Sequence, residues 1–262
     1  MPSPLRTRFP LLVPGLVIVA AWFGGMVLLV SLLTLDPGRG TRVGAAPAPP
    51  GLDLPVSKED RDTSRANLKR LAAAMHNHEA ASLHLPPAAS SGTDGKPLLS
   101  WRVALLPFLQ QGELFKQFRR DEPWDSDHNK PLVEKMPAVF ASPGLTAPKG
   151  HAFYKVFTGG GLFGGRTPLK VIACTDGLSN TILVAEAGEP VPWTKPEDIV
   201  YEPGKMLPKL ALPNTDAVLL VATGDGAQRD VHLKNVSGPT VEAAITPAGG
   251  EVLANGWWRG NP

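Results

Sequence analysis

Histidine and glutamate residues that could bind a metal ion occur together in the sequence MHNHE, residues 75–79. A helical metal site needs ligands on one face, and side chains at positions i and i+4 share a face. His76 and His78 are two positions apart, so they lie on different faces of a helix. We therefore predict a surface pair of histidines near a helix end, with Glu79 beside it, and not a metal site.

Another histidine lies among carboxylates in the sequence WDSDHN. Oxygen atoms of Asp125 and Asp127, next to His128, could bind a small cation. Aspartate and asparagine side chains also bond the nearby backbone in turns, which explains the same residues without a ligand. The sequence favours turns here, and it predicts no metal ligand and no cofactor.

Cys174, the one cysteine, excludes an internal disulfide and a thiolate zinc cluster. A Cys–His hydrolase would need a positioned histidine and an oxyanion hole, and the sequence VIACTDG contains no signature of either. Ser179 lacks the flanking glycines of a nucleophile elbow. We predict a buried structural thiol and no catalytic residue. A hydrolase that uses Cys174 or the His128 cluster is kept as a third hypothesis.

Glycine-rich segments are typical of phosphate-binding loops and of tight turns. Residues 159–165, GGGLFGG, share only their glycines with a phosphate-binding loop, because Arg166-Thr167-Pro168 follows where Lys-Ser/Thr and a helix would be needed. We predict a flexible loop. Two Asp-Gly pairs are predicted to form tight turns: Asp176-Gly177, followed by Asn180, and Asp225-Gly226.

Aromatic side chains are the remaining candidates for ligand or partner contacts: Trp124, Trp193 and Tyr201. Two of them lie in the proline-rich segment 190–210, which we predict to form an extended arm over the domain. Such an arm is either a binding surface or a staple across the domain, and the sequence does not distinguish between these roles.

The elements that must position these residues follow a long apolar segment. Residues 11–35 contain no charged side chain, and about 20 apolar residues span the hydrocarbon core of a bilayer. A cleaved signal peptide is the alternative, but its apolar region is about 7–15 residues long. We predict a short tail at 1–10 and an uncleaved, single-pass transmembrane helix at 11–35, in the cytoplasmic (inner) membrane.

Charge indicates the orientation of the chain and one class of partner to exclude. Two arginines precede the predicted span and two follow it closely, so the amino group of the tail tips the balance toward a head on the non-cytoplasmic side. Without Arg6 and Arg8, the chain has 24 basic and 24 acidic residues. Such a neutral head excludes a generic nucleic-acid binder, which needs excess Lys and Arg.

Beyond the span, residues 36–57 are rich in proline, glycine and alanine and are predicted to form a flexible tether. A globular head at 58–256 and a short tail at 257–262 complete the chain. The head is predicted to be α+β, with one long helix packed on a mostly antiparallel sheet.

Hydrophobic spacing predicts the elements of the head. A helix is predicted over 58–79, with Ser57 as its N-cap. Two short helices within 101–118 are broken near Pro107 and Gly112, and another helix covers about 129–136. Ser237 caps a last helix. Strands are predicted near Val139 and at 152–157, 170–174, 181–187, 217–222 and 229–233, the last two as a hairpin.

Several segments together resemble the domain of unknown function 1559 family, the prepilin-like proteins of planctomycete bacteria with a His-x9-Asp-Gly signature. The matching sequences are NLKRLAAAMHNH (67–78), SWRVALLPFLQQGELFKQF (100–118), PWDSDHNKPLVEKMPAVF (123–140), TDGLSNTILVAEA (175–187) and VPWTKPEDIVYEP (191–203). The resemblance implies a pseudopilin-like fold, an N-terminal helix in the membrane and an α+β head outside. It implies no enzymatic activity.

The chain departs from this family at informative positions. It lacks the prepilin leader with its glutamate, so prepilin processing is not expected. Ser64 and Ser142 occupy positions where members usually have cysteines, which fits the loss of one disulfide. Thr215 occupies the signature histidine position, ahead of Asp225-Gly226.

Two main functions remain. The first is a membrane-anchored, non-enzymatic protein whose head contacts an unidentified envelope protein or another copy of itself. The alternative is a module that binds a solute or carbohydrate through exposed Trp or Tyr side chains.

Overall fold

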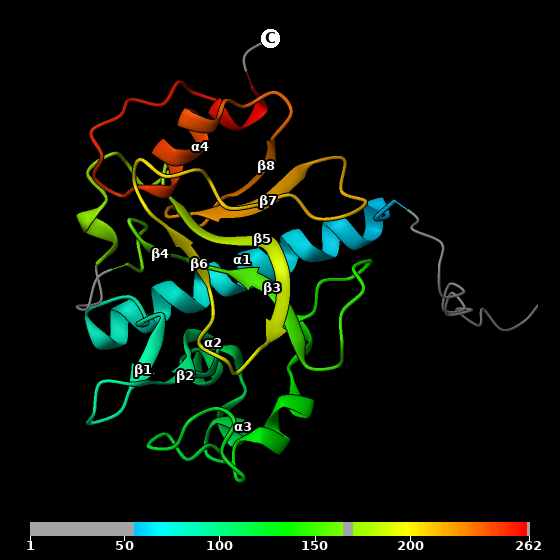
Figure 1. Ribbon diagram of the computed structural model, residues 1–262, viewed down its shortest axis with the longest axis vertical. Coiled ribbons are helices and arrows are strands. Elements are labelled where there is room, and N and C mark those ends of the chain that lie inside the picture. Colours follow the sequence, from blue (N-terminus) through cyan, green and yellow to red (C-terminus); the bar gives the residue numbers. More distant parts are fainter. Residues whose placement is uncertain (1–54, 165–169, 261–262) are drawn as a thin grey trace, which may run out of the picture. The chain divides into compact units, whose positions relative to one another are not determined.

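The computed structural model describes residues 55–164 and 170–260 (Figure 1). The chain divides into two units, Met1–Pro50 and Gly51–Pro262, and all described residues belong to the second. Within the described ranges, no helix combines the length and apolar composition needed to cross a bilayer. The predicted tail, the span at 11–35 and nearly all of the tether lie outside these ranges.

The long helix α1, Lys58–Ser82, confirms the first predicted element and runs three residues beyond the predicted end. Ser57 caps it, because its side-chain oxygen accepts a hydrogen bond from the backbone N–H of Asp60 at 3.1 Å. Leu83 ends it in the left-handed conformation, with φ of 66°. The apolar stripe predicted for this helix is fully buried: Leu68, Leu71, Ala72 and Met75.

A four-stranded antiparallel sheet packs against α1 (Figure 1). Its strand order is β3–β5–β7–β8, with bounds His151–Lys155, Ile182–Pro192, Val218–Thr223 and Gln228–His232. Helix α1 contacts β5, β7 and β8. One long helix on an antiparallel sheet confirms the predicted α+β class.

Buried side chains form two cores, one on each face of this sheet. Successive residues of one strand enter different cores: Leu220 packs in the core beside α1, and Val221 in the other core. Helix α4, Gly238–Ile245, covers the second face through Val241 and Ala244. The central strands are therefore buried on both faces, which explains why β5 and β7 are almost continuously apolar.

Two smaller sheets complete the strands. β1, Ala89–Ser91, pairs antiparallel with β2, Pro97–Ser100. β4, Phe157–Gly159, pairs parallel with β6, Ile199–Tyr201. The second sheet fastens part of the proline-rich segment to the glycine-rich segment.

The region 101–118 forms three short helical turns, not two: α2 (Trp101–Ala104), the 3-10 helix η1 (Leu106–Leu109) and α3 (Gly112–Phe115). Pro107 lies in the first turn of η1, where its missing N–H is not needed, so it does not break the helix. Gly112 begins α3.

Two predicted strands are wrong. The segment near Val139 is the 3-10 helix η3, Ala138–Phe140, and the segment 170–174 contains the 3-10 helix η4, Val171–Ala173. Short apolar runs are equally typical of strands and of buried helical turns, so their sequence could not distinguish the two. The helix predicted over 129–136 is the 3-10 helix η2, Lys130–Lys135.

The C-terminal elements largely confirm the predictions. β7 and β8 form the predicted hairpin, and α4 has Ser237 as its N-cap with a proline in the first turn. Just beyond the predicted boundary at 256, Trp257 is buried in the second core within the 3-10 helix η5, Trp257–Arg259.

Glycines 159–164 pack closely, contrary to the predicted flexible loop. A Cβ atom on Gly161 would lie 2.5 Å from Cβ of Phe157, and one on Gly159 would collide with the carbonyl oxygen of Tyr201. The intervening Leu162 and Phe163 are buried. These glycines allow the backbone to approach the neighbouring β6, since any side chain would collide. The end of the predicted loop lies outside the described residues.

Candidate functional site

Two of the three aromatic candidates are buried. Trp193 is 0% exposed, stacks on Phe140 with 5.5 Å between ring centroids, and donates its ring N–H to the carbonyl of Val133 at 3.0 Å. Tyr201 is 3% exposed. Neither ring offers a free face, so neither is available as an exposed stacking residue. At Trp193 and Tyr201 the segment 190–210 therefore packs into the core and acts as the predicted staple across the domain.

Trp124 is the candidate that remains accessible. It is half-buried, and the ammonium group of Lys195 lies 5.8 Å from the ring centroid. Its backbone N–H donates to Leu98 at 2.9 Å. Trp124 contributes one partly covered face, and the structure does not bring it together with Trp193 or Tyr201 in an open site.

The predicted turn at Asp176-Gly177 is present, with φ of 97° at the glycine. Asn180 donates its side-chain N–H to the carbonyl of Asp176 at 2.9 Å. The Asp176 carboxylate accepts the backbone N–H groups of Gly249 and Gly250, at 2.7 and 3.0 Å. This turn holds the segment after α4 in place. The Asn180 amide, the Asp176 carbonyl and the Asp176 carboxylate therefore all have structural roles.

The second predicted turn, Asp225-Gly226, closes the β7–β8 hairpin. The Asp225 carboxylate accepts the Thr223 hydroxyl at 2.6 Å and the N–H of Ala227 at 3.0 Å, and Gly226 has φ of 80°. Thr215, at the signature histidine position, is buried and donates to the carbonyl of Leu212 at 2.9 Å. These contacts stabilise the hairpin and the loop before it.

The residues of the hydrolase hypothesis are not poised for catalysis. Cys174 is buried, and burial raises the pKa of its thiol, which disfavours the reactive thiolate. The Nε2 atom of His128 lies 2.8 Å from the carbonyl oxygen of Gln117, so it serves a backbone contact. No group of three metal-binding side chains occurs within the described ranges. The region around His128 is a series of turns, as predicted.

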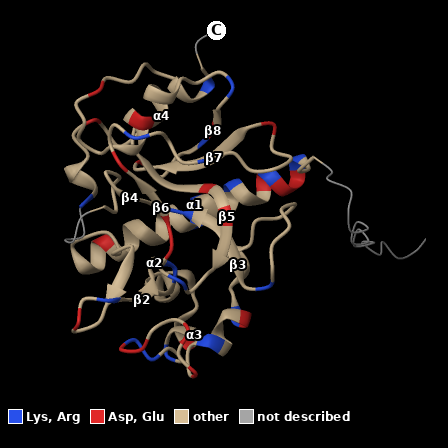
Figure 2. Ribbon diagram, viewed as in Figure 1, with Lys and Arg blue, Asp and Glu red and all other residues tan. Residues whose placement is uncertain are grey.

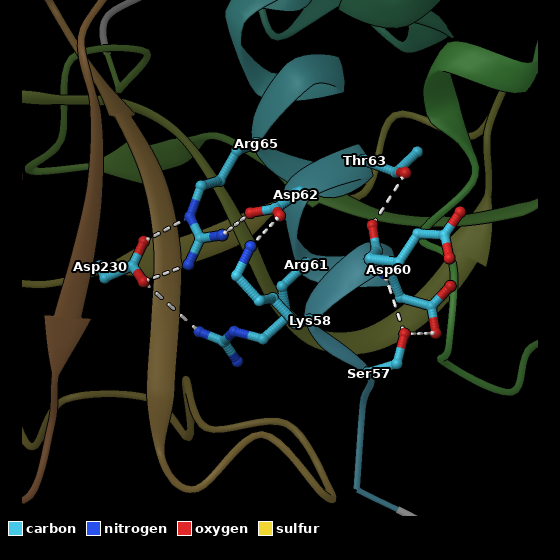
Figure 3. A network of polar contacts seen from close by, with 9 residues as sticks. Ser57, Lys58, Asp60, Arg61, Asp62, Thr63, Arg65 and Asp230 are labelled. Carbon is cyan, nitrogen blue, oxygen red and sulfur yellow. Dashed lines mark hydrogen bonds and ion pairs between the residues drawn. The ribbon is translucent and has the colours of Figure 1, made fainter.

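Charged residues form a network where the chain enters the head (Figure 3). Arg65 donates from two nitrogens to both oxygens of Asp230 on β8, with Nε at 3.0 Å. Arg61 reaches the same carboxylate at 3.8 Å. Figure 2 shows basic and acidic residues interleaved over these first turns of α1. The network joins the start of α1 to the hairpin.

The pKa shifts within this network favour its charged form. Hydrogen bonding to Asp230 raises the pKa of Arg65. Burial alone would raise the pKa of Asp230, but the hydrogen bonds and charge of Arg65, together with the charges of Arg61 and His232, outweigh it and lower that pKa. One step earlier, the N–H of Val56 donates to the carbonyl of Asn214 at 3.1 Å. Val56 and the first turns of α1 are therefore bonded both to the loop before β7 and to the β7–β8 hairpin.

A buried polar cluster lies between α1 and the sheet. The Ser64 hydroxyl donates to Glu186 at 2.7 Å and accepts the Tyr154 hydroxyl at 3.2 Å. The Ser142 hydroxyl is buried beside Glu186 and Tyr154, but it makes no hydrogen bond of good geometry among the described residues. Ser64 and Ser142, at the two positions where the resemblance implies cysteines, therefore share Glu186 and Tyr154 as buried neighbours.

Burial dominates the electrostatics of this cluster. It raises the pKa of Glu186, although the bond from Ser64 opposes the shift. It also raises the pKa of Tyr154, with the nearby charge of Glu186 adding to the effect. A carboxyl with a raised pKa can act as an acid or base, but Glu186 is only 5% exposed. The cluster is a structural part of the core.

A second buried pair joins Arg102 and Asp198, with 3.1 Å between nitrogen and oxygen and side chains 0% and 3% exposed. Asp198 also accepts the N–H groups of Trp101 and Val156. Nearby Lys155 is 6% exposed, and burial together with the charge of Arg102 lowers its pKa. These groups fasten α2 to the loop before β6.

His78 contradicts the predicted surface pair, since it is only 9% exposed. Its Nδ1 atom lies 3.1 Å from the carbonyl oxygen of His84, and its ring meets Phe108 edge-on with 5.5 Å between centroids. A carbonyl oxygen accepts only, so Nδ1 carries the proton and Nε2 has a free lone pair. Burial lowers the pKa of His78, which keeps the ring neutral. Glu79 accepts the N–H of Val171 at 2.8 Å.

His78 lines a cavity of about 320 Å³ beside the C-terminal end of α1. We call it the α1-end cavity. Strands β1 and β2, helix α2, the turns η1 and α3 and the loop after α3 supply most of the other walls, including Ser90, Val103, Pro107, Phe108, Phe115 and, in that loop, Arg120. Its position was not predictable from sequence, although the aromatic and apolar stripe of 101–118 indicated that this region packs on α1.

The lining of the α1-end cavity is suited to binding a ligand. Its walls are mostly aromatic and aliphatic, with one histidine and one arginine as strong polar groups. Nucleophilic catalysis needs a nucleophile within reach of a base and an orienting group. Among the described lining residues, no such triad is present.

Comparison with protein families finds a match over residues 61–157, to the family described as Protein of unknown function (DUF1559). This segment runs from α1 to the start of β4 and contains every residue that lines the α1-end cavity. No curated protein and no solved structure matches the chain. The family resemblance inferred from the sequence is thus confirmed, and the family description specifies no activity.

Proposed function

We propose that this chain, in which residues 61–157 match the DUF1559 family of unknown function, is a membrane-anchored, non-enzymatic protein of the cell envelope. In this proposal residues 11–35 cross the inner membrane once and residues 36–57 form a tether. The head, from residue 58 onward, lies on the non-cytoplasmic side. It contacts another envelope protein or a second copy of itself.

The observation that carries the proposal is how firmly the chain is joined to the head where the tether ends. Val56 is bonded to Asn214, Ser57 caps α1, and Arg65 and Arg61 hold Asp230 of the hairpin (Figure 3). Such a joint transmits the position of an anchor to the whole sheet. An uncharged run of 25 residues precedes it in the sequence and is long enough for a span.

The non-enzymatic part of the proposal is supported by what occupies the reactive side chains. Cys174 is buried as a thiol, His128 contacts a backbone carbonyl, and Glu186 is enclosed in the core. Each therefore has a structural role that uses its reactive atom or hides it.

The proposal also includes a pseudopilin-like arrangement without prepilin processing. The helix-on-sheet head is compatible with it, and the matching family segment begins within α1. The proline-rich tether distinguishes this chain, because it would interrupt the single continuous helix on which pilin packing depends.

Alkaline carbonate extraction of membranes tests the anchor. We expect the full chain to stay in the membrane fraction and the head to be cleaved by protease added to spheroplasts. The variant Val19→Arg/Leu28→Arg should be extracted, since two arginines in a span cost about 5–7 kcal/mol. The matched variant Val19→Leu/Leu28→Val should behave like the wild type. Extraction of the wild-type chain would contradict the proposal.

Native mass spectrometry of the chain in mild detergent then tests for a partner. A reproducible heteromeric or homomeric assembly supports envelope contacts and gives the mass of the partner. A monomer with a discrete small adduct favours a solute-binding head, although Trp193 and Tyr201 would not form its site because both are buried.

A further inference from the structure

We propose that the α1-end cavity binds a small aromatic carboxylate that carries a hydroxyl group on its ring. This inference goes beyond the proposed function, because it identifies a ligand site within the head and does not depend on the membrane anchor. Three features of the cavity support it: its walls, one unpaired cation and one free acceptor.

The walls select an apolar, ring-shaped body. Phe108 and Phe115 are half-buried and both border the cavity, and Val103 and Pro107, which precede Phe108 in the chain, add to the apolar wall. Aromatic rings pack against one another in offset or edge-on geometry, which contributes about 0.5–1.5 kcal/mol beyond area burial. A volume of about 320 Å³ is near the lower limit for ligand pockets, about 300–1,000 Å³. One ring with a short side chain fits this volume.

The rim selects a negative group. The guanidinium carbon of Arg120 lies 5.3 Å from the centroid of Phe115, and the side chain is exposed. Neighbouring Arg119 pairs with Glu122 at 3.0 Å, whereas Arg120 has no carboxylate partner among the described residues. The fork of N–H donors on arginine matches a carboxylate. Arg120 therefore presents an available anion-binding group beside an aromatic wall.

The interior selects a hydrogen-bond donor. His78 holds its proton on Nδ1 toward His84, so Nε2 is an acceptor, and no hydrogen bond to Nε2 occurs among the described residues. A carboxylate would be repelled by that lone pair, whereas a hydroxyl can donate to it. The ligand is thus oriented, with its carboxylate at Arg120 and its ring hydroxyl at His78.

The cavity is far from the point where the chain enters the head. His78 follows Ser57 by twenty-one positions, which corresponds to about 30 Å along the helix. A ligand at this end would not contact the Arg65–Asp230 network.

Isothermal titration calorimetry on the full chain in lipid nanodiscs, with 3-(4-hydroxyphenyl)propionate as the probe, tests the inference. We expect saturable binding with a Kd on the order of 0.1–1 mM for so small a molecule. Removing the ring hydroxyl, with 3-phenylpropionate, should weaken binding about three- to tenfold. Replacing the carboxylate by the amide should weaken it similarly.

Arg120→Gln should weaken the carboxylate probe about three- to tenfold and leave the amide probe unchanged. Arg119→Gln is the matched control, because Arg119 is an adjacent exposed arginine that does not line the cavity; it should leave both affinities unchanged. Ala104→Phe, which fills the cavity, should abolish binding while near-UV circular dichroism shows a folded head.

The inference is overturned by any of three results. These are no saturation up to about 10 mM probe, equal affinity in Arg120→Gln and Arg119→Gln, or full affinity in a folded Ala104→Phe variant. The extraction experiment reports on the anchor alone, so failure of one proposal is distinguishable from failure of the other.

Discussion

Arg102→Met is the substitution for which the structure predicts the largest single effect on stability. The guanidinium is 0% exposed and donates to Asp198 at 3.1 Å, to Ser100 at 2.7 Å and to the carbonyl of Tyr154. Without it, the Asp198 carboxylate stays buried with only the neutral N–H donors of Trp101 and Val156. Removing one partner of a buried pair costs about 3–5 kcal/mol.

That cost would be a large part of the free energy of unfolding of a typical domain, about 5–15 kcal/mol. Most of it should come from the stranded charge and not from the lost contact itself. Adding Asp198→Asn, which is neutral and keeps one acceptor, should therefore recover about 1–3 kcal/mol relative to the sum of the two single variants.

Urea unfolding of the full chain in maltoside micelles measures these differences. Tryptophan fluorescence is a suitable probe, because Trp101 and Trp193 are 0% exposed. Arg70→Met is the control, since Arg70 is exposed on α1 and outside any ion pair among the described residues; it should change stability by less than about 0.5 kcal/mol. A loss below about 1 kcal/mol in Arg102→Met, or simple additivity in the double variant, would refute this reasoning.

Three further predictions concern the polar cluster and the close backbone approach. Glu186→Gln should stabilise the fold at pH 8 and have no effect near pH 3.5, because burial raises the folded-state pKa of Glu186 and the ionised form costs about 1.4 kcal/mol per pH unit of that rise. Thermal unfolding across pH measures this difference in stability, and a gain confined to low pH would contradict the prediction. The double variant Ser64→Cys/Ser142→Cys should form a disulfide in oxidising buffer, since both side chains lie beside Glu186 and Tyr154. The intact mass after alkylation detects the disulfide. Two alkylated thiols in these positions of the folded protein would contradict the prediction. Gly161→Ala should destabilise the fold by about 1–3 kcal/mol, because the added Cβ collides with Phe157. Gly112→Ala, in open space on α3, is the control and should be neutral or stabilising by up to about 1 kcal/mol. Equal urea midpoints for the two variants would contradict the prediction.

Local patterns were sufficient for the elements with strong capping and periodicity. Ser57 with an acidic first turn predicted the start of α1, and the stripe containing Leu68 and Met75 predicted its buried face. Asp225-Gly226 predicted the hairpin turn. Each of these features is decided within a few residues, by a side chain that bonds its own backbone or by a repeat along one face.

Short apolar segments were not decided locally. The residues around Val139 and Val171 form helical turns with their own backbone bonds, from Ala141 to Ala138 and from Cys174 to Val171. In the second turn, the carboxylate of Glu79 accepts the remaining N–H of Val171. Trp193 and Tyr201 looked available in a proline-rich arm, but β5 extends to Pro192 and β6 pairs with β4, which carries both rings into the interior.

The sequence by itself determined the α+β class, the long helix and the hairpin, because these depend on short-range periodicity, caps and turns, and it carried the family resemblance that is matched over residues 61–157. Only the tertiary structure decided which polar side chains are buried together. Ser64, Tyr154 and Glu186 come from three separate elements. His78 meets Phe108, and lines one cavity with Arg120, only where α1 packs on the turns after β2. Side chains far apart in the chain acquire partners, burial and shifted pKa values through packing, and no local pattern encodes that juxtaposition.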